Sequence, residues 1–188
     1  MLTGSIASLG SQYVIGLKAV NCDTGAVLAE AQEQAPDKEA VLKTLDAAAV
    51  GLRGKLGESL NSVQKYDTPL AEATTPSLEA LQAYSLGQKT RFANGDSAQL
   101  PFYRRAVELD PNFAIAYTSM SNVYSNLGEA GRAAEYARKA YGLREKVSDR
   151  ERLYIEAHYY DEATGELEKA AQVYELWKQT YPRDEILT

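Results

Sequence analysis

The chain has 188 residues, of which 45% are apolar and 24% are charged, and this composition is that of a folded globular protein rather than a disordered one. The formal charge of −6 argues against a sequence-independent affinity for nucleic acid or for anionic membranes, because both require a surplus of Lys and Arg. The single cysteine, Cys22, and the single histidine, His158, exclude an internal disulfide and a metal site built from several thiolates or imidazoles.

The first part of the chain has the pattern of a small α/β element. YVIGLKAVN, at 13–21, is rich in β-branched and aromatic residues, DTG at 23–25 supplies a turn, and AVLAEAQEQ alternates apolar and polar positions. A shorter strand is expected at about 5–9. Because three strands alone make a poor core, we expect a helix on one face of the hairpin and an element that is incomplete by itself.

A helix is predicted directly after these strands. Asp37 is the expected N-cap, and apolar residues then recur at three- and four-residue spacing: Val41, Leu42, Leu45, Ala48, Ala49, Leu52 and Leu56. Gly51, Gly54 and Gly57 also fall three apart, which predicts that the helix backbone lies close to a neighbour such as the sheet. The segment GLRGKLGES lacks the glycine and serine spacing of a phosphate-binding loop, so we predict no nucleotide site there.

The α/β element is assigned to residues 1–60, and NSVQKYDTPLAEATT, at 61–75, is predicted to be a linker. Residues 76–188 are expected to form consecutive helices with short connections. Thr75 is the expected cap of the first of these helices. Pro76 would occupy its first position, where a missing N–H costs nothing.

Further helix boundaries are marked by short motifs. Asp110-Pro111 and Pro182 predict turns between helices. Ser148 and Glu151 have the spacing of a capping box before LYIEAHYY, which predicts that a helix begins there.

Three windows of the helical part, beginning at residues 80, 114 and 151, share aromatic and small residues at corresponding positions. The shared positions are occupied by Gly87, Tyr103, Ala106 and Pro111; by Tyr117, Tyr124, Gly128, Ala133 and Ala140; and by Tyr154, Gly165, Ala170, Tyr174 and Pro182. The step from Ala106 to Ala140 is 34 residues, whereas Pro111 and Pro182 are 71 apart. About three residues are therefore inserted before the third window, and they fit at 148–150.

A 34-residue helix–turn–helix pattern of this kind resembles the tetratricopeptide repeat. The third window departs from the family pattern, with His158 in place of the usual glycine and Trp177 in place of the usual alanine. The resemblance implies a right-handed α-helical solenoid of about three helix pairs, at 80–113, 114–147 and 151–184. The expected fold is thus mainly α, with a small α/β element at its N-terminus.

A wider resemblance covers both halves of the chain. The order LGSQYVIGLKAVNCDTG, LRGKLGESL, TTPSLEALQAYSLG, RRAVELDPNFAIAY and ELWKQTYPRD is similar to the region that follows the kinase domain in bacterial, notably acidobacterial, serine/threonine protein kinases. The sequence has no glycine-rich phosphate loop, no His-Arg-Asp loop and no Asp-Phe-Gly motif, so no kinase residue is assigned to it. This resemblance implies that the chain is part of a larger signalling protein and favours a location on the extracytoplasmic side of a membrane.

By the first resemblance, the first helix of each pair lines a concave groove. The positions that face such a groove are occupied by Leu81, Tyr84, Gln88, Arg91 and Phe92; by Ile115, Thr118, Asn122, Ser125 and Asn126; and by Arg152, Ile155, Tyr159, Glu162 and Ala163. Aromatic, amide and arginine side chains suit an extended peptide or a helix as ligand. The set contains no lysine, so the clamp with which some family members hold a carboxy-terminal carboxylate is not expected.

Enzymatic chemistry has little support in the sequence. Cys22 and His158 belong to different elements, and carboxylates such as Glu166 and Glu168 are typical of a solvated helix face. No stretch approaches the roughly 20 apolar residues of a membrane span, and MLTGSIASLGSQ lacks the features of a signal peptide. We therefore expect no catalysis, cofactor, metal, nucleic-acid partner or membrane insertion of this chain.

Two functions remain. The first is a non-catalytic module that binds a protein or peptide ligand in the groove. The alternative is self-association, with a homodimer covering an apolar face of the last helix formed by Val173, Leu176, Trp177 and Tyr181. Such a face would also be covered by a further repeat if the chain is a fragment of a longer array.

Overall fold

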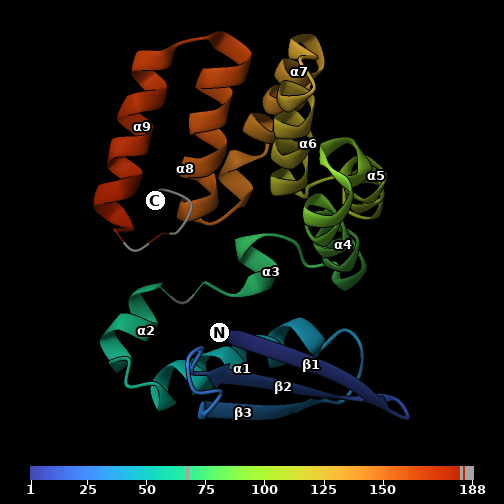
Figure 1. The fold of residues 1–188 in the computed structure, drawn as a ribbon, viewed down its shortest axis with the longest axis vertical. Helices are drawn as coiled ribbons and strands as arrows, with labels where there is room; N and C mark the ends of the chain where they lie inside the picture. Colours follow the sequence, from blue (N-terminus) through green and yellow to red (C-terminus); the bar gives the residue numbers. More distant parts are fainter. Residues whose placement is uncertain (67, 183, 185–188) are drawn as a thin grey trace. The chain divides into compact units, whose positions relative to one another are not determined.

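A computed structural model describes the backbone of residues 1–66, 68–182 and 184; within these ranges, the side chains of 64–66, 71, 73 and 92–94 lie outside the described part. The chain divides into two compact units, Met1–Ala71 and Glu72–Thr188 (Figure 1). The first unit contains a sheet with a helix against it, and the second consists of helices, so the chain is mainly helical with a three-stranded antiparallel sheet at its N-terminus.

The sheet of the first unit has the order β1-β2-β3, with β1 at Leu2–Leu9, β2 at Gln12–Val20 and β3 at Val27–Ala35. A two-residue turn that starts at Gly10, with φ 65°, joins β1 to β2. Helix α1, at Val41–Lys55, packs against β2 and β3, where Leu52 contacts Ala29 and Ala31. Strand β1 is exposed along its whole length, because α1 does not cover it.

Two expectations about α1 are wrong. The N-cap is Ala40, and Asp37 instead accepts a hydrogen bond from the Ala40 N–H in the preceding turn. Gly51 and Gly54 do not bring the helix close to the sheet, because a Cβ atom added at either position would meet no atom within 4 Å. The glycines lie on the solvent side of α1, so close packing does not require them.

The segment that the sequence predicts to be a linker contains two short helices, α2 at Leu60–Tyr66 and α3 at Leu70–Ala73. The Leu70 N–H donates to both oxygens of Asp46 in α1, at 3.1 and 3.2 Å. Upstream, the Arg53 guanidinium binds both oxygens of Glu58, at 2.7 and 2.8 Å. The contact between Leu70 and Asp46 fastens part of the segment to α1, which its linker-like composition did not indicate.

The second unit is a series of three helix pairs. The first pair is α4, Leu78–Asn94, and α5, Leu100–Leu109, separated by the short 3-10 helix η1, Asp96–Gln99. The second pair is α6, Ala114–Asn126, and α7, Ala130–Gly142. A 3-10 turn, η2, at Arg144–Lys146 leads to the third pair, α8, Asp149–His158, and α9, Leu167–Thr180, with the π-helical turn η3, Tyr159–Thr164, between them.

The start of α4 differs from the expected one. Ser77 is the N-cap and accepts a hydrogen bond from the Ala80 N–H at 3.1 Å. Thr75 lies two residues earlier, where it accepts from the Ser77 N–H and donates to the Asp110 carboxylate at 2.6 Å. Thr75 thus joins the start of the first pair to the turn that ends it. At α8 the expected cap is present, because Ser148 accepts from the Glu151 N–H.

Small residues at equivalent repeat positions let the paired helices approach. Ala106 and Ala140 are buried in their second helices, and Gly87 in α4 lies against the ring of Tyr103 in α5. In the second pair, the Ser121 hydroxyl takes the place of Gly87 and donates to the Ala133 carbonyl at 2.8 Å. In the first two pairs, the helices therefore meet closely near the middle of the first helix.

Gly87→Ala should lower the free energy of unfolding by about 1–3 kcal/mol, the usual cost of overpacking. A Cβ atom at this position would lie 2.5 Å from Cε1 of Tyr103, whose ring is buried and whose hydroxyl is held by Gln99. The matched control is Gly131→Ala in α7, where a Cβ atom would meet nothing within 4 Å. This control should stabilise the helix by about 0.5–1 kcal/mol. Urea unfolding of both variants tests the pair, and equal effects would show that the crossing at Gly87 can relax.

The extra residues before the third window are divided between two places. Leu81, Tyr84 and Gln88 of α4 have equivalents in α8 that lie 70 positions later. Ala106 and Trp177, the equivalent buried residues of the second helices, are 71 positions apart. One additional residue is therefore accommodated after the middle of α8, where η3 supplies the wider turn of a π-helix.

Candidate functional site: the groove of the helical unit

A groove with a volume of about 740 Å³ lies in the second unit, along the first helix of each pair. We call it the α4–α6–α8 groove. Its lining consists of Thr74, Leu81, Tyr84, Gln88, Arg91, Asp96, Gln99, Tyr103, Ile115, Ser119, Asn122, Val123, Ser125, Asn126, Arg150, Glu151, Tyr154, His158 and Glu162. The groove thus extends across all three pairs, and most of the residues that line it carry a polar group.

Phenol, amide and hydroxyl groups form hydrogen bonds across the floor of the groove. Tyr84 of α4 shares a hydrogen bond with the Ser119 hydroxyl of α6 at 3.2 Å and accepts one from Gln88 at 2.7 Å. The Asn122 amide of α6 donates to the Tyr154 hydroxyl of α8 at 2.8 Å. Each pair is therefore linked to the next by a polar contact within the groove, which fixes the spacing of the three helices.

Burial changes the acidity of the groove's titratable groups. It raises the pKa of Tyr84, and it raises the pKa of Tyr154 to about 12. His158, whose Nδ1 lies 2.9 Å from the Tyr154 carbonyl oxygen, has a pKa that burial lowers. Both phenols are therefore protonated and His158 is neutral near pH 7.

Glu151 differs from the other polar side chains of the groove in its hydrogen bonding. Its side chain lines the groove, and its Oε2 is buried without a hydrogen-bond partner, the only such side-chain atom in the described part of the chain. Burial raises the pKa of Glu151 to about 7, against opposing effects of a hydrogen bond with Thr74 and of the charge on Arg150. The carboxyl group is therefore balanced between its neutral and ionised forms near neutral pH.

The charged groups around the groove are largely paired. Arg150 binds both oxygens of the buried Asp184, with Nε and Nη2 at 2.6 and 2.7 Å. Arg91 lies 4.0 Å from Asp96, which also accepts from Asn126 at 2.9 Å. No cation in the described lining remains for Glu151 as a close partner.

Most groove residues predicted for the first two helices line the groove: Leu81, Tyr84, Gln88, Arg91, Ile115, Asn122, Ser125 and Asn126. Thr118 does not, because it is buried and donates to the Ala114 carbonyl. The side chain of Phe92 lies outside the described residues.

The set predicted on the third helix is shifted by one residue. Arg152, Ile155, Tyr159 and Ala163 do not line the groove, whereas Glu162 does. Ile155 is buried against Ala114 and Ala140, and the Tyr159 ring stacks on Tyr141 with centroids 3.8 Å apart. On α8, the lining residues that the sequence missed are Arg150, Glu151, Tyr154 and His158. Glu151, Tyr154 and His158 lie 70 positions after Leu81, Tyr84 and Gln88 of α4, and this spacing would have identified them. The prediction instead used a repeat window that begins at residue 151, which is one residue out of register.

The apolar face predicted on the last helix is not formed as expected. Trp177 has an exposed fraction of 0% and packs edge-to-face on Tyr154, with centroids 5.6 Å apart. Its indole Nε1 donates to Asp184 at 2.9 Å. Val173 and Tyr181 are half-buried, which leaves Leu176, 53% exposed, as the one member of the set in the exposed class.

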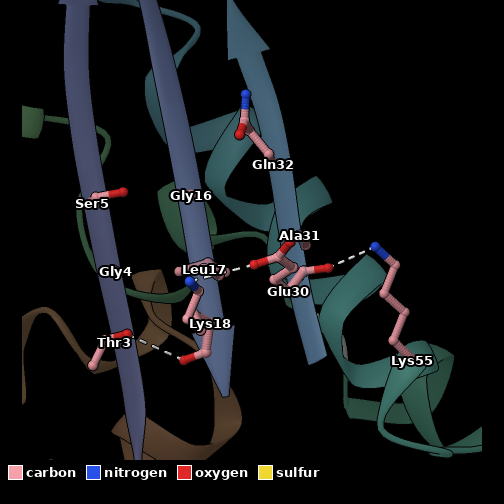
Figure 2. A pocket seen from close by; sticks show the side chains of 10 residues that line it. All are labelled: Thr3, Gly4, Ser5, Gly16, Leu17, Lys18, Glu30, Ala31, Gln32 and Lys55. Atoms are coloured by element: carbon pink, nitrogen blue, oxygen red, sulfur yellow. Dashed lines mark hydrogen bonds and ion pairs between the residues drawn. The ribbon is translucent and has the colours of Figure 1, made fainter. Parts of the chain in front are cut away.

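A second, shallower hollow of about 590 Å³ lies on the sheet of the first unit (Figure 2). Figure 2 shows its charged side chains in contact with one another or with backbone: Lys18 lies 3.5 Å from Glu30, and Lys55 donates to the Glu30 carbonyl at 2.6 Å. The Thr3 hydroxyl donates to the Lys18 carbonyl. The charged side chains of this hollow are therefore engaged in contacts within it.

Other kinds of site were sought over the described residues. They contain no group of three or more His, Cys, Asp or Glu side chains that could hold a metal ion. Within the same residues, no helix combines the length and the apolar character that crossing a membrane requires. The groove is thus the one place where an unsatisfied polar atom and a cavity coincide among these residues.

Comparison with known proteins gives a family match for part of the helical unit. Residues 102–135 match the family model described as "Tetratricopeptide repeat". No curated protein matches the chain. Two solved structures described as crystal structures of MamA are similar to it. The first has 18% identity and a TM-score of 0.38, over 79% of this chain and 77% of that chain. The second has 21% identity and a TM-score of 0.41, over 77% of this chain and 82% of that chain.

The family match gives no support to an association with kinases, and no enzyme family was found. The matched segment spans α5, α6 and the first half of α7, and therefore includes the middle of the groove. Residues 102–135, which lie within a unit of three helix pairs, therefore match the tetratricopeptide repeat.

Proposed function

We propose that the helical unit is a non-catalytic binding module that holds an extended segment of a partner protein in the α4–α6–α8 groove. The observation that carries this proposal is the continuity of the groove across three pairs, with a volume of about 740 Å³. Tetratricopeptide repeats are in general protein-interaction modules, so the family match agrees with a protein partner.

The chemistry of the lining favours a peptide. Half-buried phenol and amide groups such as Tyr84, Asn122 and Tyr154 are held in place by hydrogen bonds, so little side-chain entropy is lost when they contact a ligand. A peptide backbone carries donors and acceptors along its whole length, which match such a lining. We infer a scaffold or sensor role from this surface.

Ser125→Arg should reduce the affinity for groove-binding peptides at least about tenfold, because its long charged side chain would occupy the groove. The peptides are obtained by selecting a random display library on the wild-type chain, and their affinities are measured by fluorescence anisotropy. Ser85→Arg is the matched control, since Ser85 is exposed on α4 and lies outside the groove lining. Equal affinities for both variants would refute binding in the groove.

Self-association through the last helix was the alternative, and no observation favours it. Leu176 is exposed, but Trp177 is turned into the interior, and the exposed residues one turn from Leu176 include Gln172, Gln179 and Thr180. A dimer face normally needs a contiguous apolar area, which this surface of α9 does not provide.

A further inference from the structure

The position of Glu151 within the repeat explains why its carboxyl group is unusual. Relative to α4, it occupies the place of Leu81, a half-buried apolar residue of the groove. An acid has thus replaced an apolar side chain at the end of the groove where Thr74 and Arg150 lie. Its Oε2 receives no hydrogen bond, although the other buried polar side-chain atoms of the described residues have partners.

The nearby basic groups do not compensate for this acid. The Arg150 guanidinium is directed to Asp184 through both Nε and Nη2, at 2.6 and 2.7 Å. On the other side, Tyr84 and Tyr154 are protonated phenols, and the charge of Glu151 contributes to the raised pKa of Tyr84. His158 is neutral because burial lowers its pKa.

A further acid of the groove, besides Glu151 and Asp96, lies along the same surface. Glu162, in η3, lines the groove with Glu151, whereas the groove's two arginines are paired with Asp184 and Asp96. Because each arginine is neutralised by its aspartate, the remaining charge of the groove comes from Glu151 and Glu162 and is negative. A ligand that places a positive group there would restore the pairing that the protein itself lacks.

We propose that the α4–α6–α8 groove recognises a basic side chain of its peptide ligand, a lysine ammonium or an arginine guanidinium, through the carboxyl group of Glu151. This inference rests on the proposed function and names the class of ligand. The terminal torsion of a glutamate side chain is soft, so a small rotation presents either oxygen to the groove. Tyr84, whose pKa the charge of Glu151 raises, lines the groove near the same carboxyl group.

Recognition of a cation couples binding to proton release. A basic side chain pairs with the ionised form of Glu151, whose pKa in the free protein is about 7. Affinity should therefore rise about tenfold between about pH 6 and about pH 8, as the ionised fraction grows. Arg150 keeps its charge and both tyrosines remain protonated over this range, and the lowered pKa of His158 moves its titration towards the acidic end, whereas the pKa of Glu151 lies inside the range.

The test uses peptides selected from a random display library on the full wild-type chain. We expect the selected sequences to share a lysine or arginine at one position. Synthetic versions with that residue replaced by glutamine should bind at least about tenfold more weakly. Glu151→Gln, which keeps the size of the side chain, should cause a loss of the same order and abolish the pH dependence. Glu168→Gln on the exposed surface of α9 is the control and should bind as the wild type does.

Two further measurements make the result decisive. The carboxyl ¹³C signal of Glu151 should titrate near pH 7 in the free chain and shift to a lower pKa when the basic peptide is added. Each peptide is measured with a free and with an acetylated N-terminus, and loss of binding on acetylation would assign the cation to the terminal amine and overturn the side-chain proposal.

The outcomes separate the two proposals. If selected peptides bind Ser125→Arg poorly but contain no basic residue and bind Glu151→Gln with unchanged affinity, recognition of a cation is wrong and the groove function stands. If Ser125→Arg binds every selected peptide as the wild type does, the groove is not the binding surface and both proposals fail.

Discussion

Trp177→Ala should lower the free energy of unfolding of the helical unit by about 3–5 kcal/mol, the usual cost of removing a buried tryptophan ring. Trp177 is fully buried between Tyr154 and Tyr174, whose ring centroids lie 5.6 and 6.3 Å from its own. Its truncation would leave a cavity and would also remove the Nε1 donor from Asp184. The unfolding transition is followed by far-ultraviolet circular dichroism, because most of the helix lies in this unit.

Trp177→Phe separates the two contributions. It keeps most of the ring but loses the hydrogen bond to Asp184, so we expect a smaller loss of about 2 kcal/mol. Leu176→Ala is the neighbouring control and should cost less than about 1 kcal/mol, since its side chain is 53% exposed. A stable, folded Trp177→Ala chain of unchanged unfolding free energy would contradict the buried position.

Because Trp177 is buried, a charged substitution at this position does not test self-association. Trp177→Glu would bury an unpaired carboxylate beside Asp184, so it should disrupt the third pair rather than separate two folded subunits. Light scattering alone would not distinguish a chain with a disrupted third pair from a folded chain whose dimer has dissociated. Leu176→Glu, on the exposed side of α9, is the substitution that tests self-association without disturbing the core.

The repeat predicted much of the helical unit, because its small residues recur where paired helices must touch. Alignment of Trp177 with Ala106 and Ala140 already placed it at a position that the structure buries in all three pairs. The prediction of an exposed face used the helix periodicity of α9 alone and did not apply this equivalence. The error therefore arose from weighing a local pattern above the repeat.

The groove residues of α8 could not be predicted from a single repeat length. The residues inserted before the third window are divided between the start of α8 and the π-helical turn η3, and a π-turn has no reliable sequence signal. Glu151 was predicted as part of a capping box with Ser148. Only its backbone N–H has that role, while its side chain turns into the groove.

In the first unit, the sequence predicted the strands and α1 from residue alternation and helical spacing. It could not predict the position of the glycines in α1, because glycine spacing does not show whether a face is packed or exposed. The helices α2 and α3 were missed for a related reason. They depend on contacts with α1, such as that between Leu70 and Asp46, rather than on local propensity.

The second large effect is a dependence of stability on pH that Glu151 causes. Its pKa is about 7 in the folded chain and 4.5 in its ordinary state, so the folded chain retains a proton that the unfolded chain has lost between these values. The free energy of unfolding therefore falls as the pH rises through this window and becomes constant above it. From about pH 5 to about pH 8, the contribution of Glu151 should decrease by about 2–3 kcal/mol.

The difference between the profiles of the wild type and Glu151→Gln isolates this contribution. His158 acts in the opposite direction, since its lowered pKa makes the folded chain less stable as the pH falls below about 6.5, and its effect cancels in the difference. Glutamine has the shape of the protonated acid, so the two chains should be similarly stable near pH 5, and the variant should be the more stable one near pH 8. A flat difference would mean that folding does not raise the pKa of Glu151, so that its carboxyl group is ionised in the folded chain over most of this range. In that case the groove would hold a permanent negative charge, and the affinity for a basic peptide would lose its pH dependence while keeping its dependence on Glu151.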